Sequence, residues 1–145
     1  MADRPVFSLE AANALVPELR SLVGRQLDRR HDIESRLKSL ATLLGEVPNE
    51  IAPDDADPPD VRTLKLDLVA RIAEYQQGWQ DVESLGCVVK DARMGLVDFY
   101  GEVDGKHVWL CWKYGEPEIG FFHALDEGYS GRRAIRTSVR QRHLN

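Results

Sequence analysis

The chain has 145 residues, of which 43% are hydrophobic, and a formal net charge of −5. This length and apolar content predict one compact domain with a single core. No apolar run is long enough to cross a bilayer, and the first ten residues, MADRPVFSLE, lack the apolar centre of a secretion signal. With only two cysteines, Cys87 and Cys111, there is no disulfide framework. We therefore expect a cytoplasmic protein with buried, reduced thiols and no membrane partner.

Charge is distributed unevenly along the sequence. Residues 46–60 contain six acidic residues and no lysine or arginine, and setting these six aside changes the formal charge of −5 to +1. A basic tail can bind phosphates, but the chain lacks a nucleic-acid-binding motif, so we do not expect a nucleic-acid partner. A solvated terminus, or one that folds back onto the acidic segment, explains the tail as well. The tail arginines are Arg132, Arg133, Arg136, Arg140 and Arg142.

Hydrophobic periodicity predicts two long helices in the first part of the chain. The first spans residues 8–45, with Ser8 as its N-cap and a kink near Pro17, which lacks an amide donor. Residues 46–60 are rich in proline and acid and predict a linker. The second helix spans residues 61–85 and ends before Gly86. The two helices are similar in length and are expected to form an antiparallel hairpin.

Residues 87–123 change to an alternating pattern and predict an antiparallel β-meander of three or four strands, followed by a loop and basic tail over 124–145. Asp104 and Gly105 lie between two apolar runs, which is the signal for a two-residue hairpin turn with positive φ. This turn fixes the pairing of the flanking strands. The expected pairs are Glu102 with His107, Tyr100 with Trp109, Phe99 with Leu110, Asp98 with Cys111, and Val97 with Trp112.

Alternation then sorts these strands into two faces. The first face is apolar and suited to pack on the helical hairpin: Val97, Phe99, Val103, Val108, Leu110 and Trp112. The second is a mixed face on which chemistry or a partner would be met: Asp98, Tyr100, Glu102, His107, Trp109, Cys111 and Lys113.

The next hairpin has a less defined turn. If residues 114–117 form it, Cys111 pairs with Gly120 and Val108 pairs with His123. Glu118 and Phe122 then join the mixed face, whereas His123 joins the core face. A slip of one residue would reverse this assignment.

Four stretches, FSLEAANALVPEL, GLVDF, LCWKYGEPEIGFFH and GYSGR, resemble a bacterial family of unknown function, family 2203. The acidic linker and the arginine tail lie outside this pattern. The resemblance implies no activity, because the family is uncharacterised. It implies only that nine residues belong to the family's signature stretches: Asp98, Cys111, Trp112, Glu116, Glu118, His123, Gly128, Gly131 and Arg132.

One hypothesis is a metal or small-anion site built from Asp98, Glu118 and His123, with Glu116 or Glu83 as a further candidate ligand. Carboxylate and imidazole ligands suit zinc, iron or manganese, and an open position would permit hydrolytic or redox chemistry. The spacing matches no known ligand signature, and the expected register places His123 across the sheet from the two acids. A divalent metal is therefore the only cofactor that the sequence suggests.

The hypothesis that we favour is a non-catalytic binding or interaction module. Its helical hairpin would pair with a second copy, giving a homo-oligomer. Its mixed face would meet a protein or a small ligand through aromatic anchors such as Tyr100, Trp109 and Phe122. The residues expected on this ligand or partner face are Asp98, Tyr100, Trp109, Cys111, Glu118 and Arg132.

Two further possibilities carry less weight. Cys111 could act as a nucleophile with His107, but their separation is long for a hydrogen bond and Asp98 would raise the pKa of the thiol. Arg132 and Arg133, which follow two glycines, could clamp an anion or merely lie in a surface turn. The sequence thus predicts an α+β protein, in which a long antiparallel helical hairpin packs on the meander. The sequence favours a non-catalytic protein over an enzyme.

Overall fold

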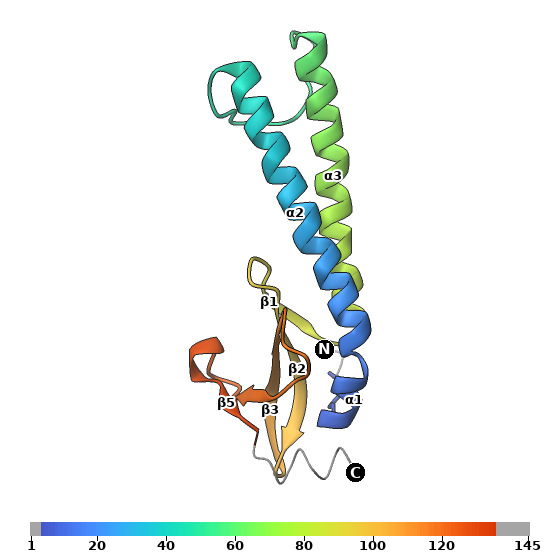
Figure 1. Cartoon of the computed structure of the whole chain (residues 1–145), viewed down its shortest axis with the longest axis vertical. Coiled ribbons are helices and arrows are strands. Elements are labelled where there is room, and N and C mark those ends of the chain that lie inside the picture. The colour runs from blue at the N-terminus through green and yellow to red at the C-terminus, as the bar shows by residue number, and fades with distance from the viewer. Residues whose placement is uncertain (1–3, 136–145) are drawn as a thin grey trace. The chain divides into compact units, whose positions relative to one another are not determined.

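The structure is a computed structural model that describes residues 4–135. It confirms the α+β class, with helices in the first part of the chain and a sheet in the second (Figure 1). Its contacts group into two units, one formed by residues 25–80 and one by the segments before and after them. None of the described helices is both long enough and apolar enough to span a membrane.

The first predicted helix is interrupted at Leu15. α1 spans Leu9–Ala14 and α2 spans Val16–Leu44. Ser8 caps α1 as expected, because its Oγ accepts a hydrogen bond from the amide of Ala11 at 3.0 Å. The break comes two residues before Pro17, which lies in the first turn of α2. An amide donor is not needed in a first turn, so proline is tolerated there.

α3 spans Pro59–Glu83, so it begins and ends two residues earlier than predicted. Proline suits its first position for the reason given for α2. Gly45 follows α2 with φ of 79°, and Gly86 follows α3 with φ of 104°. Both lie in the left-handed region, where glycine ends a helix at little cost. The chain between α2 and α3 contains no helix or strand, as the composition of residues 46–60 predicted.

Residues 25–80 form an antiparallel hairpin of α2 and α3 (Figure 1). Its apolar seam consists of buried Ile33, Leu40, Val61 and Leu68, with half-buried side chains around them. Gln26 is also fully buried, and its amide donates a hydrogen bond to the carbonyl of Tyr75 at 2.6 Å. A Cβ at Gly78 would collide with the side-chain end of Gln26, so a larger residue there would displace the Gln26 amide.

The sheet has five antiparallel strands in the order β1-β2-β3-β4-β5. They are β1 (Val88–Asp91), β2 (Leu96–Val103), β3 (Lys106–Lys113), β4 (Phe121–His123) and β5 (Arg133–Ala134). The sheet therefore has more strands than the three or four that were predicted. β5 pairs with β4, and the amide of Ile135 donates to the carbonyl of Gly120 at 2.9 Å. Residues 136–145, which include Arg136, Arg140 and Arg142 of the predicted tail, lie outside the described residues.

All five cross-strand pairs predicted for β2 and β3 are confirmed. Asp104 and Gly105 have φ values of 52° and 78°, as the predicted two-residue turn requires. On the apolar face, Phe99 and Leu110 are fully buried, and Phe7 packs edge-on against Phe99 with ring centroids 5.0 Å apart. Phe7 also makes a parallel bridge to Gly101 of β2.

The predicted register between β3 and β4 was wrong by one residue. Trp109 pairs with His123 and Cys111 pairs with Phe121. The connection is longer than a four-residue turn, because β4 resumes only at Phe121. Before that, Asn13 of α1 holds the chain, since its Oδ1 accepts a hydrogen bond from the amide of Ile119 at 2.7 Å. The extra residue reverses the faces, so that His123 and Phe121 lie on the mixed face and Phe122 does not.

Leu110→Ala is expected to lower the free energy of unfolding by about 2 to 5 kcal/mol, because it leaves a cavity where Leu110 is 0% exposed. Val47→Ala, at a position 82% exposed, is the control and should change stability by less than about 0.5 kcal/mol. Chemical denaturation followed by circular dichroism measures both. Equal stability of the two variants would contradict the placement of Leu110 in the core.

Candidate metal centre

Three side chains with ligand chemistry meet on the mixed face of the sheet. Asp98 of β2 is directly opposite Cys111 of β3, and His123 of β4 is opposite Trp109, two residues from Cys111 on the same face. Asp98 is 1% exposed, Cys111 is 0% and His123 is 2%. One potential ligand atom from each lies within 4.8 Å of the other two. Three adjacent strands therefore enclose a carboxylate, a thiol and an imidazole.

His123 makes two hydrogen bonds that define its ring protonation. Its Nδ1 lies 3.0 Å from the carbonyl oxygen of Ala124, which can only accept, so Nδ1 carries a proton. Its Nε2 faces Oδ2 of Asp98 at 2.8 Å. A proton between these two atoms therefore resides either on the carboxyl group or on the imidazole. If that proton leaves, Nε2 presents a lone pair toward Asp98.

Burial raises the pKa of Asp98 above its usual value, and the nearby His123 opposes this rise. The other oxygen, Oδ1, is buried and accepts no hydrogen bond of normal geometry from the described residues. The Cys111 thiol interacts with the carboxylate, but a thiol is only a weak donor. A buried carboxylate oxygen without a strong donor is costly, and a cation would satisfy it.

Burial is also the main reason why the pKa of the Cys111 thiol rises to about 12, and the negative charge of Asp98 adds to it. The hypothesis of a nucleophilic Cys111 paired with His107 is not supported by this arrangement. The side chain of His107 is instead 2.9 Å from the hydroxyl of Tyr100 through Nδ1. Cys111 is a protonated thiol at neutral pH unless a cation displaces its proton.

Arg132 brings a positive charge to this group from the C-terminal segment. Its Nη2 donates to both carboxylate oxygens of Glu116, each at 2.9 Å, and its guanidinium lies 3.9 Å from the ring centroid of Phe121. Glu116 is itself fixed, because its Oε1 accepts from the amide of Lys113 at 2.7 Å. The charge of Arg132 acts to lower the pKa of Cys111, so it favours a thiolate there.

The three ligand types suit a tetrahedral zinc ion. Zinc bonds of about 2.0 to 2.3 Å place ligand atoms about 3.3 to 3.8 Å apart, so small side-chain rotations would close this group around the ion. Borderline metals such as cobalt accept the same combination of thiolate, imidazole and carboxylate. The group lies within the sheet unit and uses no residue of the hairpin at 25–80.

The predicted site residues are only partly brought together. Asp98 and His123 meet, and Cys111 takes the position that the metal hypothesis gave to Glu118. Glu118 lies in the connection before β4 and is not among the three residues that meet. Glu83 instead accepts a hydrogen bond from the amide of Val89 at 3.0 Å. The signal for Cys111 was present, because the sequence already paired it with Asp98.

The rest of the predicted ligand or partner face forms an aromatic cluster. Tyr100 and Trp109 meet edge-on with centroids 5.7 Å apart. Nζ of Lys90 lies 4.2 Å from the centroid of the Trp109 ring. The guanidinium carbon of Arg4 lies 5.5 Å from the same centroid. Two cations therefore already contact the ring that was expected to anchor a partner.

The chain belongs to DUF2203, a family of uncharacterised conserved proteins, whose model matches residues 5–135. The matched range contains all three residues of the candidate metal centre, together with Glu116 and Arg132. Searches of curated proteins and of solved structures found no match.

Asp98→Asn tests the protonation of the buried pair. In the wild type the pKa of Asp98 is raised, so above about pH 4 the folded state holds a proton that the unfolded state has lost. The free energy of unfolding therefore falls as the pH rises from about 4 through the folded-state pKa, by up to about 1.4 kcal/mol per pH unit. In the variant the asparagine side chain does not titrate, so this component of the pH dependence disappears.

The measurement is chemical denaturation across this pH range, with exposed Asp28→Asn as the control that keeps the wild-type slope. If the wild type instead gains stability relative to Asp98→Asn as the pH rises, Asp98 is held ionised and the assignment of its pKa shift is wrong.

Proposed function

We propose that this protein binds a divalent transition metal, zinc first among them, through Asp98, Cys111 and His123. The observation that carries the proposal is the buried group of three potential ligand side chains, in which, among residues 4–135, Oδ1 of Asp98 has no hydrogen bond of normal geometry and the carboxylate has only the weak Cys111 thiol as a further donor. Buried polar side chains with a purely structural role usually have all their polar atoms hydrogen-bonded.

The burial of the site favours a metal-binding protein over a metal-dependent enzyme. Three protein ligands leave one position of a tetrahedral zinc ion open, as in catalytic sites, whereas structural sites usually have four protein ligands. Burial, however, argues against catalysis here. All three ligands here are at most 2% exposed, so a substrate has no direct approach to the ion. The role we propose is therefore to join β2, β3 and β4 in the metal-bound state, in keeping with a non-catalytic protein.

Metal binding depends on the redox state of Cys111 and on the charged side chains near it. Cys87 and Cys111 are free thiols, and a reducing compartment such as the predicted cytoplasm would keep Cys111 available as a ligand. Arg132 approaches from the segment that includes β5, where residues 125–130 are exposed.

Tag-free protein treated with a chelator is expected to bind cobalt and to show the charge-transfer absorption of a cobalt–thiolate bond. Cys111→Ser should abolish that band, because serine supplies no thiolate. The affinity of the Cys111→Ser variant for cobalt should also fall. The loss should exceed the roughly 10- to 100-fold seen when a residue that only hydrogen-bonds to a metal ligand is replaced. Titration followed by absorption spectroscopy measures both effects.

Cys87→Ser is the matched control, since Cys87 is the other buried thiol and its Sγ hydrogen-bonds instead to the carbonyl of Val82 at 3.3 Å. The Cys87 variant should retain the band. A wild type without the band, or an equal band in Cys111→Ser, would sink the proposal.

Zinc binding at pH 7 is expected to release between about one and two protons, because metal ligands must be deprotonated. One comes from the Cys111 thiol, whose pKa is about 12, and the other from the proton shared by Asp98 and His123. The other charged groups that face the cluster are Lys90, Glu116 and Arg132.

Isothermal titration in buffers of different ionisation enthalpy measures the number of protons released. Cys111→Ser should release about one proton fewer. Binding without proton release would mean that the ion is held elsewhere.

A further inference from the structure

An apolar stripe on α3 lies at the surface of the described hairpin, and of its residues Ile72 packs partly against the buried seam. It consists of Leu66, Val69, Ile72 and Ala73, at the helical spacing that gathers them on one side. Leu66 is 52% exposed and Val69 is 42% exposed. Single exposed apolar residues need no explanation, but a contiguous stripe of this kind marks a contact surface.

A groove between α2 and α3 borders this stripe and shares Ile72 with it. The groove has a volume of about 340 Å³. Its apolar part consists of Ile33, Leu37, Ile72 and Tyr75. Arg30 and Glu34 line it too and pair with each other at 2.9 Å, while Gln76 lies at its α3 side. A ridge and a groove therefore lie side by side on one surface, which we call the pairing face.

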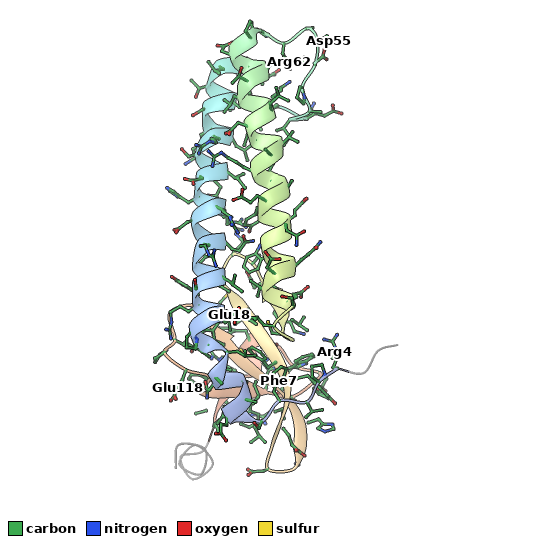
Figure 2. All side chains as sticks on the ribbon, turned by 90° about the vertical axis from the view of Figure 1, so that its right-hand side faces the viewer. Arg4, Phe7, Glu18, Asp55, Arg62 and Glu118 are labelled. Atoms are coloured by element: carbon green, nitrogen blue, oxygen red, sulfur yellow. The ribbon has the colours of Figure 1, made fainter. Side chains whose placement is uncertain are left out.

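Charge is polarised along the hairpin. At its tip, residues 46–60 carry six carboxylates, and two nearby cations of α3, Arg62 and Lys65, pair with Asp55 and Asp57. Figure 2 shows Arg62 beside Asp55 in this region. Six carboxylates against these two cations leave the tip with an excess of negative charge. At the opposite end the charges are balanced, because Arg29 pairs with Glu74 at 3.0 Å and Arg30 pairs with Glu34 at 2.9 Å.

This polarity decides how a second hairpin fits. Two copies side by side in the same direction would place two acidic tips together, which is unfavourable. Two copies in opposite directions place each acidic tip next to the charge-balanced end of the other copy, which avoids this repulsion. A pairing face that carries both a ridge and a groove is self-complementary under such a two-fold arrangement.

We propose that two copies of this chain associate through the pairing face, with their hairpins antiparallel. A two-fold axis near residues 70 and 71 of α3 brings Val69 of each copy to Ile72 of the partner subunit, and Leu66 to Tyr75 of the partner subunit. Each ridge then fills the groove of the other copy, and the four helices form a bundle. The proposal is independent of the metal centre, whose ligands lie in the other unit.

Sedimentation velocity over a range of concentrations tests the association. The full-length wild type is expected to be a dimer, and Val69→Glu should weaken the dimer by at least about tenfold, because it would bury a charge without a partner. Leu43→Glu is the matched control. Leu43 is 49% exposed on the same hairpin but lines a different hollow, so this variant should dimerise like the wild type.

Circular dichroism checks that both variants keep their helices, so that a lost dimer reports on the pairing face. A wild type that is monomeric at every concentration overturns the proposal, and its pairing face would then be left to a different partner. A dimer that Val69→Glu leaves unchanged overturns it too.

A spin label at Gln80 tests the orientation. In the antiparallel dimer two labelled sites lie about 28 Å apart along the helix axes, given a rise of about 1.5 Å per residue from the two-fold axis. In a parallel dimer the two labels would be close neighbours. A short distance between the labels would therefore contradict the antiparallel arrangement, whatever the dimer affinity.

Discussion

The hydrogen bond between His123 and Asp98 is the contact on which the site depends. It joins β4 to β2 across the intervening β3, and both side chains are almost completely buried. An isolated charge at that depth would be unstable, so each group needs the other to remain there. The same pair brings Nε2 and a carboxylate oxygen to the thiol of Cys111. Packing and potential metal chemistry therefore share one set of atoms.

The contact exists only because of the β3–β4 register, which the sequence could not supply. The Asp104–Gly105 turn is local, and its geometry follows from the two residues themselves, so the β2–β3 pairs could be predicted. The position of His123 depends instead on Asn13, which binds Ile119 from 106 residues away. No pattern within residues 113–123 contains that information. One residue of difference moved His123 from the core face to the candidate site.

The helices show the same division between local and distant causes. Apolar spacing located both long helices to within a few residues, because the 3.6-residue period is a property of the segment itself. The close approach of Gln26 to Gly78 could not be predicted, since it depends on how the two helices face each other. β5 could not be predicted for a similar reason. Its two residues are too few to form a sequence pattern, and they form a strand only because the edge of β4 is free to pair with them.

The order of segments in the chain has a consequence for synthesis. The sheet unit is discontinuous, because residues 25–80 separate Phe7 and Asn13 from their partners Gly101 and Ile119. At about 5 to 20 residues per second, roughly 5 to 20 s pass on the ribosome before Ile119 follows the end of the first segment. The hairpin can close during that interval, since its contacts are local. The N-terminal segment, with Leu9 and Ala12 destined for the interior, must wait in the unfolded nascent chain, where chaperones have time to bind it.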